Sequence, residues 1–362
     1  MRDGTRALVP VLIAASLTGC GGSSGGGGGS APWRTTTIDG TVSIRSISIA
    51  LDAAGQPHVA YLDLATNQLL YASRAGGTWT RAVIPNTTHA DEQVALVLDG
   101  GGHPHVAWQS DNGTAAGGIR YAFDGGSGWT VETVESAVVG ARVPGLSLAL
   151  TSGGVPSISF YGGDGFGLKY ATRGGAGTWG IATVDAAAYA GFHGTSLVFD
   201  AADHPVLSYF TYDYLLAAQA LRLARYDGTA WTIQIVDSGE GVGEWSSLAL
   251  DGAGHPRLAY LDTLAGTVKY AASAGTSWSI STVAPGYIAS LALAADGTPW
   301  IGFGETAGSW LKLAHLAGST WSVETLPASV DWTLSLAVDP SGGRHLAHDK
   351  GSTGAATFEE QP

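Results

Sequence analysis

The segment from Ser246 to Val283 reads SSLALDGAGHPRLAYLDTLAGTVKYAASAGTSWSISTV, and its pattern recurs along the chain. Short runs of apolar and β-branched residues alternate with clusters of glycine, proline and serine, which is typical of strands joined by tight turns. The segment therefore predicts four successive strands, at 247–251, 257–261, 267–271 and 278–283. Beyond the N-terminal apolar run, no part of the chain shows a helical period.

The tryptophan that opens the fourth strand of this segment marks a repeat. An aliphatic residue follows it five positions later in every copy, and successive tryptophans are 43 to 52 residues apart. This is the period of a propeller blade made of four strands. The seven copies begin at Trp33, Trp79, Trp129, Trp179, Trp231, Trp278 and Trp321.

The first strands of the repeats also number seven. They carry, at one shared register, Ser48, Ala95, Ser147, Ser196, Ser247, Ser290 and Ser335. The last repeat has two strands and a weak third near residues 355–359, and the chain ends before a tryptophan strand. We predict an all-β, seven-bladed β-propeller of four-stranded antiparallel blades, closed by the N-terminal strand Trp33–Ile38 in the last blade. A linear β-solenoid is the alternative, and it leaves the split repeat without a purpose.

Composition narrows the function classes. The 362 residues include 54 glycines, only 13% charged residues and a net charge of −13, so the basic footprint of a nucleic-acid-binding protein is missing. The apolar share of 45% supports a large core. With Cys20 as its single cysteine, the chain can form no internal disulfide and no cysteine-built metal site.

The N-terminus predicts export. Arg2 and Arg6 precede an apolar run of about a dozen residues, too short for the ~20 that span a bilayer. The run ends in Leu17-Thr18-Gly19-Cys20, which resembles the lipobox of bacterial lipoproteins. The resemblance implies a signal peptide at 1–19 and lipidation of Cys20, with the outer membrane favoured. The composition predicts a Gly/Ser-rich tether at 20–31, and the repeats predict a propeller domain at 32–362. A plain secretory signal with an incidental cysteine is the alternative.

The turn before the fourth strand carries a second resemblance. Residues 122–129, AFDGGSGW, are similar to the Asp-box (BNR) turn of bacterial sialidases and related propellers, with Ala122 where that motif has serine. Other repeats keep only the glycine and the tryptophan. In that family the box is a structural turn, so we expect the repeated tryptophans to pack between blades. Aromatic residues at one register of the second strands are expected to do the same, at Tyr61, Trp108, Phe160, Tyr209, Tyr260 and Phe303.

The residues three positions before the shared serine register differ from blade to blade. Most of them are large or polar, although the chain is otherwise rich in small residues. Because innermost strands begin at the central mouth of a propeller, a mixed set of charges, imidazole and aromatic rings there suits a polar small ligand. Solvated loop decoration is the alternative. With the neighbouring Arg142, the predicted ligand-binding residues are Arg45, Glu92, Arg142, His193, Glu244, Tyr287 and Trp332.

An acid follows the second strand of every blade. Such a repeated position is typical of loop capping, in which a carboxylate accepts backbone N–H groups. The alternative is an acidic ring that binds cations or sugar hydroxyls, with calcium as a possible ion. The third-strand bases Arg120, Lys169, Arg222, Lys269 and Lys312 are expected to pair with these acids. The acids are Asp63, Asp111, Asp164, Asp213, Asp262, Glu305 and Asp349.

These patterns leave three hypotheses for function. The first is a lipid-anchored, non-catalytic and monomeric propeller that binds carbohydrate or another envelope ligand. The second is a sialidase-like glycoside hydrolase, for which Arg45, Glu244, Tyr287 and Asp63 fit four of the roles known in sialidases. Three converging arginines cannot be assembled from the sequence, which favours the first hypothesis. The third is a scaffold for protein partners in an envelope complex.

Overall fold

The computed structural model describes residues 31–87, 90–110, 118–136, 145–162, 167–187, 189–213, 218–275 and 277–362, without the side chains of 90–92. Pro32–Pro362 forms one compact unit. The regular secondary structure of its described residues consists of strands, apart from the short 3₁₀ helix η1 (Gly175–Gly177). In this part of the chain, no helix combines the length and apolar character needed to cross a membrane.

The strands form seven four-stranded sheets, which we number as blades in chain order. Blade 1 contains β2 (Ile44–Leu51), β3 (Pro57–Asp63), β4 (Gln68–Ala75) and β5 (Thr78–Val83). Blade 2 contains β6 (Ala90–Leu98), β7 (Pro104–Ser110), β8 (Gly118–Asp124) and β9 (Trp129–Glu135). Blade 3 contains β10 (Leu146–Leu150), β11 (Pro156–Tyr161), β12 (Leu168–Arg173) and β13 (Trp179–Asp185). Blade 4 contains β14 (Thr195–Phe199), β15 (Pro205–Asp213), β16 (Ala218–Tyr226) and β17 (Trp231–Ser238).

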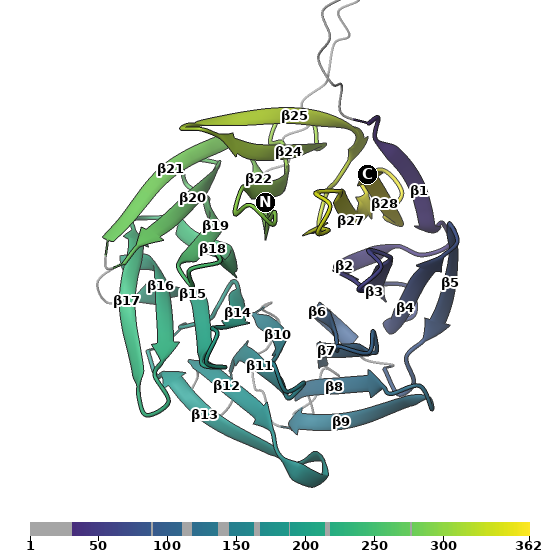
Figure 1. Cartoon of the computed structure of the whole chain (residues 1–362), viewed down its shortest axis with the longest axis horizontal. Helices are drawn as coiled ribbons and strands as arrows, with labels where there is room; N and C mark the ends of the chain where they lie inside the picture. Colours follow the sequence, from purple (N-terminus) through teal and green to yellow (C-terminus); the bar gives the residue numbers. More distant parts are fainter. Residues whose placement is uncertain are drawn as a thin grey trace, which may run out of the picture. The chain divides into compact units, whose positions relative to one another are not determined.

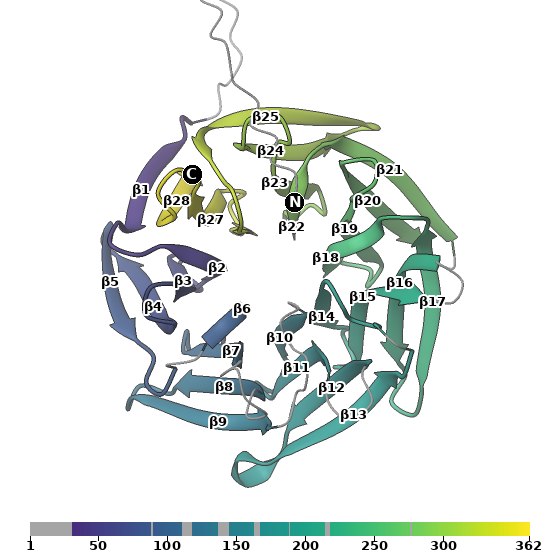
Figure 2. The same ribbon diagram turned by 180° about the vertical axis from the view of Figure 1, so that it is seen from behind.

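The remaining blades complete the ring. Blade 5 contains β18 (Val242–Leu250), β19 (Pro256–Asp262), β20 (Thr267–Ala274) and β21 (Ser277–Pro285). Blade 6 contains β22 (Tyr287–Leu293), β23 (Pro299–Gly304), β24 (Trp310–Ala317) and β25 (Thr320–Ser329). Blade 7 contains β26 (Leu334–Val338), β27 (Arg344–Lys350) and β28 (Ala355–Gln361), with β1 (Arg34–Asp39) as its outer strand. Figures 1 and 2 show the blades around a central opening, with the first strand of each blade innermost.

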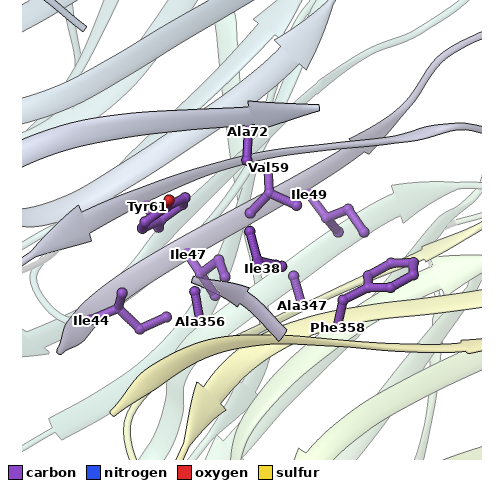
Figure 3. Packing of buried hydrophobic residues seen from close by; sticks show 10 residues of the cluster. All are labelled: Ile38, Ile44, Ile47, Ile49, Val59, Tyr61, Ala72, Ala347, Ala356 and Phe358. Carbon is purple, nitrogen blue, oxygen red and sulfur yellow. The ribbon is translucent and has the colours of Figure 1, made fainter. Parts of the chain in front are cut away.

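The N-terminal strand closes the ring, as predicted. β1 pairs antiparallel with β28, and Arg34 lies opposite Glu360. One face of blade 7 packs against blade 1 in a cluster that contains Ile38, Tyr61 and Phe358 (Figure 3). β1 thereby covers the outer edge of β28, which the C-terminal strands alone would leave unpaired.

The repeated tryptophans pack between blades, as predicted. Each of the seven lies against one of the seven apolar clusters, as Trp33 does between blades 6 and 7. Trp129 meets Tyr71 of the preceding blade edge-on at 5.5 Å between ring centroids, and Trp321 meets Tyr270 at 5.2 Å. The six second-strand aromatics are at most 1% exposed, which confirms their inter-blade packing.

A serine ladder joins the innermost strands and gives the shared serine register its physical reason. In six interfaces the serine Oγ accepts the backbone N–H of the next blade at 3.0–3.2 Å, as Ser290 does from Leu336. Innermost strands of neighbouring blades have no backbone ladder between them, so these side chains satisfy amides that face the adjacent sheet. At the interface of blades 2 and 3 the register holds Ala95, which has no oxygen to offer Leu148.

The predicted pairing of third-strand bases is confirmed in one place and wrong in two others. Lys312 Nζ lies 3.2 Å from Glu305, as expected. Arg222 and Lys269 instead bind Asp185 and Asp237, which occupy the last or second-last position of the fourth strand of the preceding blade. Each of these two carboxylates also accepts the hydroxyl of a buried second-strand tyrosine, at 2.8 and 2.7 Å. The hydroxyl of a buried tyrosine needs a hydrogen-bond acceptor, and here a carboxylate fills that role. Among the described residues, the basic side chain pairs with this carboxylate and not with the acid after the second strand.

Candidate functional site

A central channel of about 680 Å³ runs between the innermost strands of the seven blades. Small and aliphatic residues of the innermost strands form its walls, and its larger, charged and aromatic residues lie where these strands begin. We call that end the channel mouth. Of the described residues it contains Arg45, Gln93, Trp245, Ile288 and Trp332.

Trp332 is an exposed aromatic ring on a fixed backbone. Its side chain is 76% exposed, although tryptophan is usually well buried. Behind it, the fully buried carboxylate of Asp349 accepts the backbone N–H groups of Asp331, Trp332 and Thr333 at 2.9–3.2 Å. Thr333 in turn accepts the Ile47 amide of blade 1 at 3.1 Å. The indole is therefore presented to solvent from a rigid support.

Burial raises the pKa of Asp349 above its ordinary value. The three backbone N–H groups and the neighbouring His348 act in the opposite direction, because they stabilise the charged carboxylate. The hydrogen bonds that fix the backbone at Trp332 thus also stabilise the buried carboxylate of Asp349.

Trp245 lies two blades away on a bulge of β18. The pairing of β18 with β19 shifts between Glu244 and Ser247, and Trp245 has a φ of +55°. The indole stacks on His193 at 6.1 Å between ring centroids, and His193 stacks on Phe192 at 4.3 Å. Gly194 makes this approach possible, since a Cβ there would lie 3.2 Å from the Trp245 Cα. Trp245 thereby faces the channel, with the imidazole behind it.

The predicted mouth residues separate into three groups. Arg45 and Trp332 line the channel, on the adjacent blades 1 and 7. His193 and Glu244 form a pair beside it, with 3.1 Å between Nδ1 and Oε2. Tyr287 donates its hydroxyl to the Val330 carbonyl at 2.6 Å. The Glu92 side chain and Arg142 lie outside the described residues.

The sequence did not single out Trp245, Gln93 and Ile288. All three lie two positions before the ladder register, one position after the predicted set. Gln93 accepts the Leu146 amide of blade 3 at 2.9 Å, and Ile288 has a φ of +53° beside a bulge. Together Trp245, Ile288 and Trp332 form an apolar arc over three consecutive blades, and Arg45 and Gln93 continue it as a polar arc.

The acids after the second strands lie at the same edge of the blades as the mouth. Asp63 accepts the Ala65 amide at 3.1 Å and the Thr66 hydroxyl at 2.6 Å, and Asp262 accepts the Ala265 amide at 2.9 Å. These bonds hold the loops that follow the strands. Asp213 ends β15, and Asp111 and Asp164 fall outside the described residues. Among the residues that the structure describes, no group of three or more His, Cys, Asp or Glu side chains is placed to hold a metal ion.

Comparison with solved structures identifies propellers of similar architecture. An ulvan lyase of polysaccharide lyase family PL25 matches with a TM-score of 0.62 and 12% identity, over 90% of this chain and 95% of its own. A mutant of the Aleuria aurantia lectin, in complex with Fucα1-6GlcNAc, matches with a TM-score of 0.54 and 16% identity, over 82% of this chain and 99% of its own. A Hadza microbial sialidase matches at 0.51 and 14%, over 90% and 68%.

This chain shares their fold. At such identities the likeness shows the propeller architecture, with lectins and a sialidase among its structural neighbours. No family model matches the sequence, and the comparison with curated proteins found no match.

Proposed function

We propose that this chain is a lipid-anchored, non-catalytic propeller that binds carbohydrate at its channel mouth. The observation that carries the proposal is Trp332, whose ring is 76% exposed while its backbone is fixed by buried Asp349. A rigid aromatic side chain gives a large contact area at little cost in conformational entropy. That is the property of an anchor residue in a binding site, and a solvated loop has no need of it.

The two arcs of the mouth match the two faces of a sugar. A pyranose ring has an apolar C–H face, for which Trp332 and Trp245 offer flat apolar surfaces. Its hydroxyls both donate and accept, and Arg45 and Gln93 supply polar groups on the next two blades of the ring. Lectins among the fold neighbours give this ligand class further support.

A binding role is favoured over hydrolysis by what the nearby carboxylates do. Glycoside hydrolysis generally uses two carboxyl groups that flank the scissile bond. Here Glu244 lies beside His193 and accepts the Thr263 hydroxyl at 3.5 Å, and Asp63, Asp262 and Asp349 hold loop backbones. Each of these groups therefore already has a partner that explains its position.

The anchor belongs to the proposal as well. The lipobox-like Leu17-Thr18-Gly19-Cys20 and the glycine-rich tether at 20–31 support attachment to a bacterial membrane, with the outer membrane favoured. Gly/Ser-rich chains of this length generally have an end-to-end reach of ~15–20 Å, which would hold the propeller away from the lipid surface. The ligand would then be an envelope or extracellular glycan, and a protein partner is the alternative.

A glycan array with the full-length chain in detergent, with and without calcium, tests this function. We expect binding to a defined glycan set, and at least a roughly thirtyfold weaker Kd for Trp332→Ala, as for a central aromatic anchor. Ile235→Ala is the matched control, because Ile235 is 59% exposed on the outer strand β17, away from the channel. A folded protein without glycan binding, or equal losses in both variants, would refute the proposal.

A further inference from the structure

The interface between blades 6 and 7 contains a pocket of about 280 Å³, separate from the channel. Strands β24 and β25 form one wall, and β27, β28 and β1 form the other. Two fully buried polar side chains, His348 and Glu359, line it. The half-exposed indole of Trp310 lies on the blade 6 side, and Lys350 lies at the exposed end of β27.

Glu359 breaks a rule that the other six blades obey. It pairs with Leu346 of the second strand, and at the equivalent position each of the other third strands has a fully buried alanine. Blade 7 thus places a carboxylate where the repeat needs only a methyl group. The alanines are Ala72, Ala122, Ala171, Ala224, Ala271 and Ala314.

His348 is a second exception in the same place. It occupies the register at which the other blades bury Tyr61, Trp108, Phe160, Tyr209, Tyr260 and Phe303. An imidazole is smaller than any of these side chains, so the substitution leaves space between the blades. The two exceptions together make this interface both polar and hollow.

The polar atoms of the pair are only partly satisfied. Thr35 donates to Glu359 Oε2 at 2.7 Å, and His348 Nδ1 donates to the Asp349 carbonyl at 2.8 Å. His348 Nε2 and Glu359 Oε1 lie 3.5 Å apart, and neither has a hydrogen-bond partner among the described residues. A buried polar atom without a hydrogen-bond partner lowers the stability of the fold. A position that holds alanine in six blades therefore has no structural need for glutamate.

We propose that this pocket is a second binding site, which takes one neutral sugar residue. Two neighbouring sugar hydroxyls can donate, one to Glu359 Oε1 and one to His348 Nε2, which is an acceptor because Nδ1 carries the ring proton, and this satisfies both atoms. Trp310 provides an apolar wall for the ring, and the hydroxyls of Thr37 and Thr357 line the same space. The volume lies below the ~300–1,000 Å³ of ordinary ligand pockets, which limits the occupant to a single residue. This inference rests on the proposed carbohydrate binding but concerns a different site.

The test separates the two sites by substitution. Methyl glycosides of glucose, galactose, mannose and rhamnose are titrated into the full-length chain in detergent and followed by saturation-transfer NMR and calorimetry. Trp332→Ala disables the channel mouth, so the binding that it retains reports on the pocket. Adding Glu359→Ala, the side chain of the other six blades, is expected to weaken that binding by about tenfold or more, because a charge-assisted hydrogen bond is lost.

Two results would overturn the inference. One is Trp332→Ala protein that binds none of the four glycosides. The other is residual binding that Glu359→Ala and His348→Phe leave unchanged, since His348→Phe fills the pocket with the side chain that blade 6 has at this register. Binding that depends on Glu359 but not on Trp332 would support the pocket and refute the channel mouth. Thermal unfolding checks that each variant is folded, and Glu359→Ala is expected to keep or raise the melting temperature.

Discussion

The serine ladder predicts that adding a serine at its register raises the free energy of unfolding and that removing one lowers it. Ala95→Ser adds the missing oxygen between blades 2 and 3, where it can accept the Leu148 amide as Ser290 accepts that of Leu336. A neutral hydrogen bond contributes about 0.5–1.5 kcal/mol to the free energy of unfolding. Ser290→Ala removes such a bond, and water in the channel can partly replace it, so the loss is about 1 kcal/mol.

Differential scanning calorimetry can measure both changes. The unit spans Pro32–Pro362. With about 2.1 cal/mol/K of unfolding entropy per residue, 1 kcal/mol shifts the melting temperature of a domain this large by about 1.5 °C. We expect Ala95→Ser to melt higher by about 1–2 °C and Ser290→Ala to melt lower by a similar amount.

Ala253→Ser is the matched control, since Ala253 is exposed in a turn of blade 5. We expect no shift for this variant, because the added hydroxyl stays in water. An Ala95→Ser protein that melts at or below the wild-type temperature would show that the interface of blades 2 and 3 cannot accept a rung. The account of the ladder as the joint between innermost strands would then fail there.

Two further predictions concern the support of Trp332 and the anchor. Burial raises the pKa of Asp349, so the folded chain binds the proton of this carboxyl group more tightly than the unfolded chain does. The stability gained from this proton is present below the unfolded pKa near 3.8, and it is lost as the pH rises through the folded pKa. Urea midpoints should therefore improve for Asp349→Asn relative to wild type as the pH rises from about 4 to 7, and a constant difference would contradict this. Cys20→Ser removes the lipid acceptor, so it should move the chain from the detergent phase to the aqueous phase of a Triton X-114 partition; equal partitioning of both proteins would argue against lipidation.

The fold was predictable because its determinants recur. The tryptophans recur every 43 to 52 residues, and each packs on one inter-blade cluster. A pattern repeated in register along the chain outweighs the ambiguity of any single strand. The split last blade was legible for the same reason, because Trp33 has the place in its repeat that Trp321 has in blade 6.

The composition of the channel mouth was only half predictable, because bulges decide which residue faces the channel. Counting back from the ladder serine assumes regular alternation and selects Glu244 and Tyr287. In β18 and β22 a bulge places a residue with positive φ directly after Glu244 and Tyr287. These residues are Trp245 and Ile288, and they reach the channel instead. Non-glycine residues seldom adopt this conformation, and nothing in their side chains announces it.

Departures from the repeat were visible in the sequence, but they do not all have the same meaning. Ala95 omits an oxygen, which leaves the interface slightly weaker and adds no buried polar group. Glu359 adds a buried carboxylate with an unpaired oxygen among the described residues, which a propeller blade does not need for its own stability. A departure from the repeat that places an unpaired polar atom in the core therefore points to a function, whereas one that only removes a hydrogen bond does not. By this criterion Glu359 and the exposed Trp332 are the positions at which ligands should be sought first.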